Sequence, residues 1–435
     1  MSKQGLPQIN AHACGIDIGC ENNHVSVDGK TVKVFPTFTE SLSDIVKYLL
    51  ESKIETVAME STGVLWIPLY DILVSSGIEV YLVNSTHVKN IPAQKSDFQD
   101  CRWLQKTHSY GLLRASFIPT ETIRELRTYV RHRESLVDTS SQNIQRMQKA
   151  FELMNIKFHN VISDITGVSG IKVIESILSG ERNNKKLLSL CDARIKKGKS
   201  KEVLLSLQGN FKKEYLFLLS QSYQSYQFFQ EQILNCDKEI EIILSQITEE
   251  LPSPPSTPSN PARHNQPKVK NLHDMMVQML GGRDATVLPG YNDKTLLKLI
   301  SETGTDLSIW PTEKHFTSWA GLSPRKKQSG KMNRTHKINV KTKVGQIFRE
   351  SAYSIANSKY IALKGFYARI KSKHGYKTAI KATARKLAVL YYRFIVYGID
   401  YVEKGLKIYD EKYNAVLLKN LTKKARGFGY TLVKD

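Results

Sequence analysis

Two aspartates three residues apart are the first side chains of this chain whose spacing could do chemistry. Asp97 and Asp100 lie in the segment KSDFQDCRWL, residues 95–104. If the segment is helical, the two carboxylates lie on one face, about one turn apart. Like charges so close repel each other unless a cation intervenes, so the pair could hold a metal ion. The alternative is a solvated helix start, in which Ser96 caps the helix and Asp97 faces its dipole.

Two further acids lie at the ends of predicted strands. Asp17 is near the end of a short buried strand at residues 13–19, and Glu60 follows a buried strand at residues 55–59. A carboxylate inside an apolar run needs a partner or a metal ion to offset its desolvation. Strand ends deliver both acids to one edge of a sheet, where sites in such folds usually lie.

The elements that must position these acids follow from the hydrophobic pattern of the first hundred residues. Strands are predicted at residues 13–19, 24–28, 31–35, 55–59 and 79–83, and helices at residues 41–51 and 64–75. Asp28 and Gly29 are typical of the turn of a β-hairpin. With a helix that carries Asp97, the predicted order is three strands, helix, strand, helix, strand, helix.

The positive charge of the chain is concentrated in its last quarter. The 435 residues carry a formal net charge of +22, and residues 321–435 hold 27 Lys and Arg against 6 Asp and Glu. Such a block favours a polyanionic partner, of which nucleic acid is the most obvious. An anionic membrane surface and a merely solvated basic face are the alternatives. Neutralising six phosphates would weaken binding by roughly three decades between low and moderate salt.

Length and composition indicate a soluble protein of two or three domains. No run of about 18 apolar residues predicts a transmembrane helix, and residues 387–402 are interpreted as a buried helix. The first 12 residues lack the apolar core of a signal peptide. The five cysteines are scattered without a CxxC pair, which predicts free thiols in a reducing cytoplasm and no zinc site.

Two long helices are predicted from apolar residues in alternating steps of three and four. The first repeat runs through residues 123–154, with Arg133 and Ser140 at two of its core positions, and the second through residues 229–247. The two helices could pair within one chain or with another subunit. A coiled-coil stalk that dimerises is the favoured interpretation, and a helical hairpin core is the alternative. Residues 165–211 between them predict a partly helical insertion.

A proline-rich segment separates this region from the last domain. Six of the 14 prolines lie in residues 251–267, which favours a linker over a helix or strand. Beyond it, a Pro-Gly turn before an amphipathic helix resembles half of a helix-hairpin-helix, in which Gly290 could help to bind a phosphate. A capped structural helix is the alternative. In residues 364–393, basic side chains alternate with aromatic core candidates and could face a phosphate backbone.

The order of strands, helices and acids resembles the RNase H-like fold of Holliday-junction resolvases (RuvC-like). The segments GIDIG, MESTGVLW, KSDFQDCRWL and GLLRASFIP are similar to the N-terminal half of the insertion sequence 110 family of transposases. The four acids of that family's signature are matched by Asp17, Glu60, Asp97 and Asp100. The resemblance implies that they bind Mg²⁺, with two ions per site. Two such ions, roughly 4 Å apart, neutralise charge at the attacking and leaving oxygens of a phosphodiester.

The segment FTSWAGLSPRKKQSGK resembles the C-terminal domain of the same family. The resemblance implies that Ser329 is the nucleophile that becomes joined to DNA. Serine is a weak nucleophile that needs a metal ion, a base or positive charge to stabilise its alkoxide. The nearby basic residues expected to bind nucleic acid are Arg325, Lys326, Lys327, Lys331, Arg334 and Lys337. Lys331 stands where the family commonly has a second glycine, and Gln346 follows Gly345 where it usually has asparagine.

The resulting division has five parts: an α/β RNase H-like catalytic domain (1–120), a helical coiled-coil stalk with an insertion (121–250), a proline-rich linker (251–268), a mainly α, basic transposase domain with Ser329 (269–400) and a basic tail (401–435). The resemblance implies a DNA transposase guided by a structured RNA. The implied partners are donor and target DNA, that RNA, and further copies of the chain in a dimer or tetramer, without a membrane.

Three other functions fit parts of the pattern. A junction-resolving nuclease would use the acids to hydrolyse DNA and would form no covalent intermediate. The segment GIDIG also resembles the phosphate loop of actin-like ATPases and sugar kinases, but that interpretation gives Asp97, Asp100 and the basic last quarter no role. A nucleic-acid binder without catalysis is the third alternative.

Overall fold

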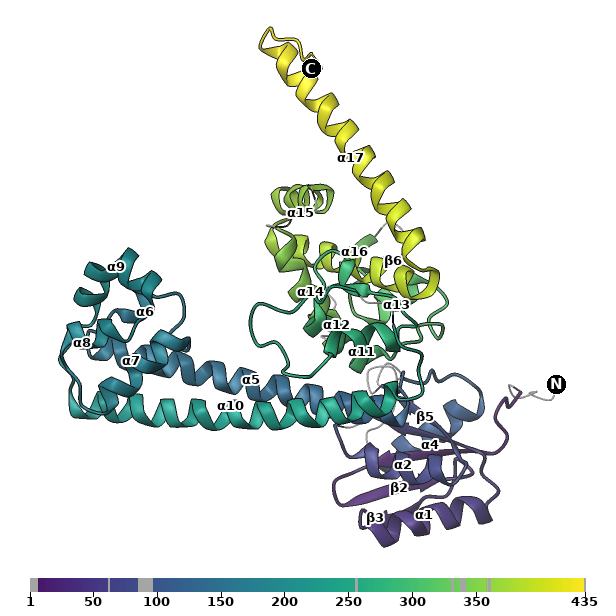
Figure 1. Cartoon of the computed structure of the whole chain (residues 1–435). Coiled ribbons are helices and arrows are strands. Elements are labelled where there is room, and N and C mark those ends of the chain that lie inside the picture. Colours follow the sequence, from purple (N-terminus) through teal and green to yellow (C-terminus); the bar gives the residue numbers. More distant parts are fainter. Residues whose placement is uncertain are drawn as a thin grey trace. The chain divides into compact units, whose positions relative to one another are not determined.

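The computed structural model describes residues 7–61, 63–84, 97–254, 257–329, 332–336, 342–356, 358 and 361–433. For residues 325–329 and 332–336 it describes the backbone alone. The chain divides into two compact units, Met1–Ile118 and Pro119–Asp435. Each unit is described by itself (Figure 1).

The first unit is built on a five-stranded sheet with the order β3-β2-β1-β4-β5. Its strands are β1 (Ala13–Ile18), β2 (Asn22–Ser26), β3 (Lys33–Pro36), β4 (Thr56–Glu60) and β5 (Glu79–Val83). The first three strands pair antiparallel, whereas β1, β4 and β5 run parallel. The predicted order of strands and helices in a mixed α/β unit is therefore confirmed.

Helices cover both faces of this sheet, and these are α1 (Thr39–Glu51), α2 (Trp66–Ser75) and α4 (Asp97–Ser109). Alternate residues of β1 point to opposite faces. Cys14, Ile16 and Ile18 enter a core with the apolar faces of α1 and α2. Helix α4 packs on the other face, against β1, β2 and β4. The central strand is thus buried on both sides, as its continuous apolar sequence predicts.

The hairpin turn between β2 and β3 is closed by the side chain of Asp28. Its carboxylate accepts hydrogen bonds from the backbone N–H groups of Lys30 and Thr31, and from the Thr31 hydroxyl. Gly29 adopts a φ of +70°, which disfavours a side chain at this position. The turn predicted at Asp28 and Gly29 is confirmed, although the strands end two residues earlier and begin later than the pattern indicates.

The second unit is mainly helical. Its first half contains α5 (Glu121–Leu153), α6 (Phe158–Val161), α7 (Val168–Leu178), α8 (Asn184–Ser189), α9 (Ala193–Ser206) and α10 (Lys213–Thr248). Its second half contains α11 (Leu272–Met279), η1 (Ala285–Val287), α12 (Asp293–Thr303), α13 (Glu313–Trp319), β6 (Arg325–Ser329), β7 (Met332–His336), α14 (Lys343–Ile355), α15 (Ile361–His374), α16 (Tyr376–Tyr397) and α17 (Ile399–Gly427). None of the helices among the described residues is long and apolar enough to cross a membrane.

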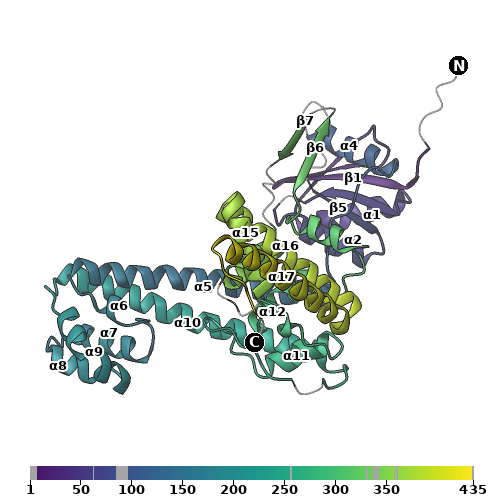
Figure 2. The same ribbon diagram turned by 90° about the horizontal axis from the view of Figure 1, so that it is seen from above.

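The long helices α5 and α10 pair with each other within the chain and run antiparallel (Figures 1 and 2). Both polar residues at core positions of the α5 repeat find partners on α10. Arg133, 2% exposed, donates to the Asp237 carboxylate at 2.5 Å, and Ser140 accepts from the Gln230 amide at 2.9 Å. Of the two pairings open from the sequence, the structure has the one within the chain.

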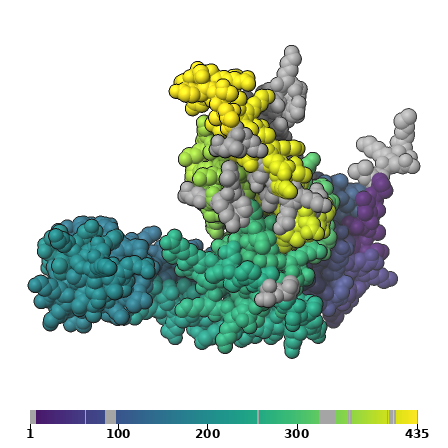
Figure 3. All heavy atoms as spheres, turned by 45° about the horizontal axis from the view of Figure 1, so that its top comes forward, coloured from purple at the N-terminus to yellow at the C-terminus, as the bar shows by residue number. Residues whose placement is uncertain are grey.

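Helices α6 to α9 close the far end of this pair and form a lobe of the second unit (Figure 3). They have their own core, to which Val173, Ile177 and Val203 contribute together with Phe151 of α5 and Leu219 of α10. The region predicted to be a partly helical insertion is therefore an ordered helical module. Both long helices contribute apolar side chains to its core.

The proline-rich segment contains neither helix nor strand in its described part, as expected, but it is not free of the fold. Arg133 donates to the Asn265 carbonyl, and Asp237 accepts from the Lys268 N–H. Asn260 donates to the backbone carbonyls of Thr286 and Tyr291. These contacts place the segment within the second compact unit, whose boundary lies between residues 118 and 119.

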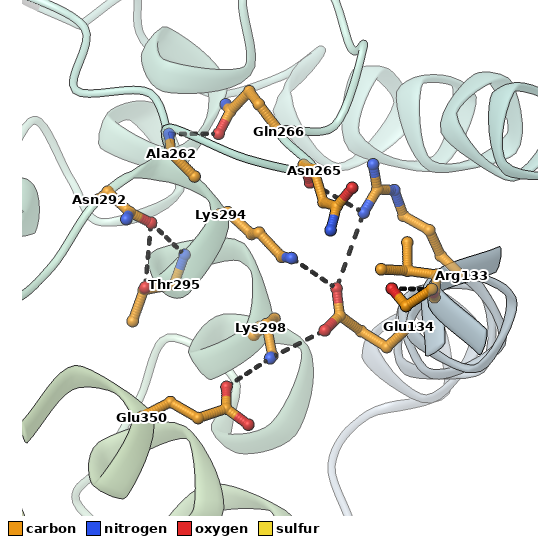
Figure 4. A network of polar contacts seen from close by, with 12 residues as sticks. Arg133, Glu134, Ala262, Asn265, Gln266, Asn292, Lys294, Thr295, Lys298 and Glu350 are labelled. Carbon is orange, nitrogen blue, oxygen red and sulfur yellow. Dashed lines mark hydrogen bonds and ion pairs between the residues drawn. The ribbon is translucent and has the colours of Figure 1, made fainter. Parts of the chain in front are cut away.

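A polar network joins α5 to the helices that follow this segment (Figure 4). Glu134 contacts the ammonium groups of Lys294 and Lys298, and Lys298 also contacts Glu350 of α14. Burial alone would raise the pKa of Glu134, but the two lysines outweigh it and hold the pKa below its ordinary value. The base of the long helix is thereby fixed to α12 and α14.

Aromatic side chains form the core of the C-terminal helices. Tyr391 and Tyr392 of α16 are almost fully buried and pack around Phe316, which also contacts Phe348. The aromatic core expected in this region is confirmed at these positions. The predicted buried helix at residues 387–402 is interrupted at Gly398, whose φ of +85° ends α16 before α17 begins.

The buried pair between the long helices gives a stability prediction. We expect Asp237→Asn to destabilise the second unit by about 2–4 kcal/mol, because the Arg133 guanidinium stays buried without its counter-charge. The amide oxygen that remains can still accept from Lys268. Urea unfolding of the purified chain measures the change.

The double variant Arg133→Met, Asp237→Asn is expected to recover most of this loss, because no unpaired charge is buried. Glu181→Gln, which removes a more exposed pair with Lys186, serves as a control and should cost less than about 1 kcal/mol. Equal losses in the single and double variants would contradict the explanation.

Candidate metal centre

Gly15 of β1 determines how closely the helix that carries two of the acids approaches the sheet. A Cβ atom at this position would lie 2.2 Å from the backbone N of Gln105 and 2.3 Å from the backbone O of Cys101. Both atoms belong to the backbone of α4, so the helix rests directly on the strand. Asp17 follows Gly15 by two residues and therefore points to the same face.

The register of the parallel strands brings a second acid to this face. Gly15 pairs with Ala58 and Ile16 with Met59, so the next step sets Asp17 beside Glu60. Glu60 is the last residue of β4. Small residues at Gly15 and Ala58 leave room for α4, whereas the acids follow where the strands end.

Helix α4 begins with the other two acids, Asp97 and Asp100. Its C-terminal half is tied to the sheet: Gln105 donates to the Ala13 carbonyl, and His108 shares a 2.9 Å hydrogen bond with the Thr56 hydroxyl. With that end fixed and Gly15 allowing close approach, the first turn of the helix lies over the strand ends. The face shared by Asp97 and Asp100 is thus brought to Asp17.

The other three acids all lie close enough to Asp17 to act on its pKa. Burial and, after it, the negative charges of Asp97, Asp100 and Glu60 together raise this pKa from 3.8 to about 6. A half-buried carboxyl beside three other acids disfavours ionisation unless positive charge is supplied. The arrangement is therefore an electrostatic fit for a cation.

His24 joins this group, although the sequence analysis assigned it only to a strand. It pairs directly opposite Asp17 in the antiparallel register of β1 and β2. Ligand atoms of Asp17, His24 and Asp97 all lie within 4.8 Å of one another. The predicted hairpin could have indicated this neighbour, because a histidine opposite an acid across a hairpin lies on the same face of the sheet. That inference would have required the exact register of the two strands.

The donor set fits a divalent metal ion. Four carboxylates supply the oxygen ligands that such ions take in proteins, and His24 adds a nitrogen. The Nδ1 atom of His24 is buried and has no hydrogen-bond partner among the described residues. Asp17, His24 and Asp97 could hold one ion between them, and Glu60 and Asp100 lie close enough to act on the same charge.

Ser329 lies in the second unit, as the last residue of β6. In the hairpin of β6 and β7 it pairs with Met332, and Lys327 pairs with Arg334 two positions away. Arg325 and Lys326 belong to the same strand. Lys331 and Lys337 lie outside the described residues.

A contact between Ala320 and Thr342 joins the two points between which the chain runs through this hairpin. The Thr342 hydroxyl caps α14 and donates to the Ala320 carbonyl at 2.7 Å. A Cβ at Gly345 would lie 2.2 Å from the same carbonyl oxygen, so glycine is needed for the close approach. The segment that carries Ser329 therefore leaves and re-enters the helical unit at one point.

Gly290 lies at a turn before α12, with a φ of +82°. A Cβ there would be 3.2 Å from the Ser351 carbonyl oxygen of α14. The start of α12 already receives protein partners: Asn292 accepts from the Thr295 N–H, and the Asp293 N–H donates to the Asn260 carbonyl. These contacts support the alternative of a capped structural helix, and phosphate binding at Gly290 stays a prediction.

Comparison with known proteins identifies the class. A family model for DEDD transposases of the IS110 type, described as transposase, matches residues 14–156, and one described as the Transposase IS116/IS110/IS902 family matches residues 285–364. No curated protein matches the chain. The first range contains all four acids and the second contains Ser329, so the molecule is a DNA transposase, an enzyme that cuts and rejoins DNA. The chain belongs to the IS110 family of transposases.

The close approach at Gly15 gives the first prediction for this site. Gly15→Ala places a methyl group against the backbone of α4, and the helix must move away. We expect a loss of about 1–3 kcal/mol in the stability of the first unit and weaker binding of divalent ions, with every acid still present. Calorimetric titration with Mn²⁺ measures the binding.

Gly198→Ala is the matched control, because a Cβ there meets no atom within 4 Å. It should leave ion affinity unchanged. If Gly15→Ala bound Mn²⁺ with the affinity of the wild type, the metal centre would not depend on this contact.

The raised pKa of Asp17 gives the second prediction. In the absence of divalent ions, Asp17→Asn is expected to stabilise the first unit at pH 7.5 by about 1–2 kcal/mol, because a half-buried charge that its neighbours repel is removed. The folded pKa of about 6 exceeds the ordinary 3.8, so ionised Asp17 opposes folding above pH 6. The advantage of the variant must therefore shrink as the pH falls from 6 towards 4.

Thermal unfolding in EDTA at several pH values measures this difference. Asp44→Asn, which removes an exposed acid of α1, is the control and should show no such dependence. A variant no more stable than the wild type at pH 7.5 would contradict the electrostatic account.

Proposed function

We propose that this transposase is a recombinase that cuts and rejoins DNA strands with its four acids and the serine nucleophile Ser329. The observation that carries the proposal is the convergence of Asp17, Glu60, Asp97 and Asp100, expressed in the raised pKa of Asp17. Such a cluster by itself destabilises the folded protein. Its presence is explained if it binds cations during phosphoryl transfer.

We further propose that the first unit is RNase H-like. The sheet order β3-β2-β1-β4-β5, with three antiparallel strands followed by parallel β4 and β5, supports this proposal. The acids at the ends of β1 and β4 and at the start of α4 support it as well. The division of the chain into five functional parts remains part of the same proposal.

Magnesium ions bound by the acids, two per site, would stabilise the charge on the attacked phosphate. Asp17 and Glu60 would contribute from the strand ends, and Asp97 and Asp100 from the helix. The acids would act in this role as charged carboxylates, which a bound cation favours. No acid needs to transfer a proton.

Ser329 would attack the phosphorus atom of a DNA strand. A bond forms between its Oγ and phosphorus, the bond from phosphorus to one sugar oxygen breaks, and the hydroxyl proton ends on that leaving oxygen. Arg325, Lys326, Lys327 and Arg334 in the same hairpin, with Lys331 and Lys337, would bind phosphates and stabilise the alkoxide. The phosphoserine ester keeps the energy of the broken bond, so rejoining needs no ATP.

The partners follow from charge and from the separation of the two sites. Residues 321–435, with 27 basic and 6 acidic residues, would bind donor and target DNA and a structured guide RNA. The acids and Ser329 belong to different compact units. The reaction therefore requires the two units to meet, within one chain or between chains of a dimer or tetramer.

A test of a shared site uses two inactive chains. We expect a mixture of Ser329→Ala and Asp97→Ala chains to regain recombination, because an intact serine of one chain can work with the intact acids of the other. Each variant alone should be inactive. Recombination of a plasmid substrate, scored by sequencing of the junctions, measures rescue.

No rescue would show that each site is confined to one chain. Denaturing electrophoresis of labelled DNA separates the proposal from hydrolysis: a recombinase leaves a DNA adduct that Ser329→Ala abolishes. Cleavage without an adduct, unchanged in Ser329→Ala, would favour a junction-resolving nuclease.

A further inference from the structure

His24 is a largely buried histidine, and one of its ring nitrogens has no hydrogen-bond partner among the described residues. The residue is 8% exposed, and that nitrogen is Nδ1. Burying a polar nitrogen without a partner costs free energy, so such atoms in folded proteins generally bind a water molecule, an ion or a ligand. The Nδ1 atom therefore needs a ligand, and the neighbouring side chains determine which ligand fits.

Those surroundings are carboxylates. His24 pairs with Asp17 across the β1–β2 ladder, and ligand atoms of His24, Asp17 and Asp97 lie within 4.8 Å of one another. When three atoms each lie about 2 Å from one metal ion, they are separated by up to about 4 Å. Small side-chain rotations would therefore bring all three to the same ion.

The imidazole ring is held in place by the helix that carries the acids. The Phe98 ring contacts His24 edge-on, with 4.9 Å between the ring centroids. Phe98 lies between Asp97 and Asp100 in sequence, so the packing that orients the ring also fixes the first turn of α4. A ring held by an aromatic neighbour is pre-organised as a ligand.

We propose that His24 is a nitrogen ligand of the centre, together with Asp17 and Asp97, and that it makes this centre favour a divalent transition-metal ion such as Mn²⁺ over Mg²⁺. The inference rests on the metal-binding role of the acids in the proposed function. Mg²⁺ prefers oxygen ligands and retains its water molecules, whereas divalent transition-metal ions accept imidazole nitrogen more readily.

The inference is tested by measuring ion binding instead of recombination. The full-length chain is titrated with Mn²⁺, with free Mn²⁺ followed by electron paramagnetic resonance and Mg²⁺ added as competitor. We expect His24→Asn to weaken Mn²⁺ binding about 10- to 100-fold and Mg²⁺ binding less than about 3-fold. Pulsed spectra of bound Mn²⁺ should show a ¹⁴N coupling that the variant lacks.

His12→Asn is the matched control, because His12 is exposed in the same unit. His24→Gln is a second substitution of the same residue, to be used if His24→Asn does not fold. Thermal unfolding checks that each variant is folded. The inference is overturned if the wild type shows no ¹⁴N coupling, if the coupling persists in His24→Asn, or if both ions weaken equally.

Asp17→Asn separates this failure from failure of the metal centre itself. If Mn²⁺ binds to the wild type, is lost in Asp17→Asn and shows no nitrogen coupling, the acids bind the ion and only the role of His24 is wrong. If Asp17→Asn binds Mn²⁺ as the wild type does, the acid centre is wrong and the inference falls with it.

Discussion

The close packing of α4 on β1 is the constraint on which the candidate centre depends. At Gly15 the strand and helix backbones approach so closely that no Cβ fits between them. That contact turns four acids from three distant segments into one cluster, since it sets the first turn of α4 over the strand ends. The hydrogen bonds of Gln105 and His108 keep the other end of the helix in register. The acids themselves contribute repulsion, so apolar packing must hold them together.

This arrangement lowers the stability of the folded first unit and raises its affinity for cations. Asp17 is half-buried beside like charges, and its pKa is raised because the folded chain disfavours its ionised form. The same interaction favours any bound cation, because a cation relieves burial and repulsion at once. The second unit resolves its buried charges differently: Arg133 faces Asp237, and Glu134 faces two lysines, so charge is balanced within the protein. The cluster around Asp17 in the first unit instead brings together charges of one sign.

The sequence predicted the order of the elements and the two long helices because each leaves a local pattern. The four acids were grouped as one site by the resemblance to the family, and their roles stay a prediction. Asp17 and Glu60 end apolar strands, and the repeats of α5 and α10 are regular. What escaped prediction depends on which residues face each other. His24 acquires meaning only opposite Asp17, and the partners of Arg133 and Ser140 lie about a hundred residues away on α10. The proline-rich segment has the composition of a linker, but its backbone groups form hydrogen bonds within the second unit, and composition does not predict these bonds.

The matched polar pairs between α5 and α10 also set a length. Because Arg133 must meet Asp237 and Ser140 must meet Gln230, the two helices cannot slide past each other by a turn without burying unpaired groups. Helix α5 has 33 residues, which at 1.5 Å per residue gives a rod of about 50 Å. That is the length of about fifteen base pairs of duplex. The helix pair therefore has a fixed register and a length of about 50 Å, with the module of α6 to α9 at its far end.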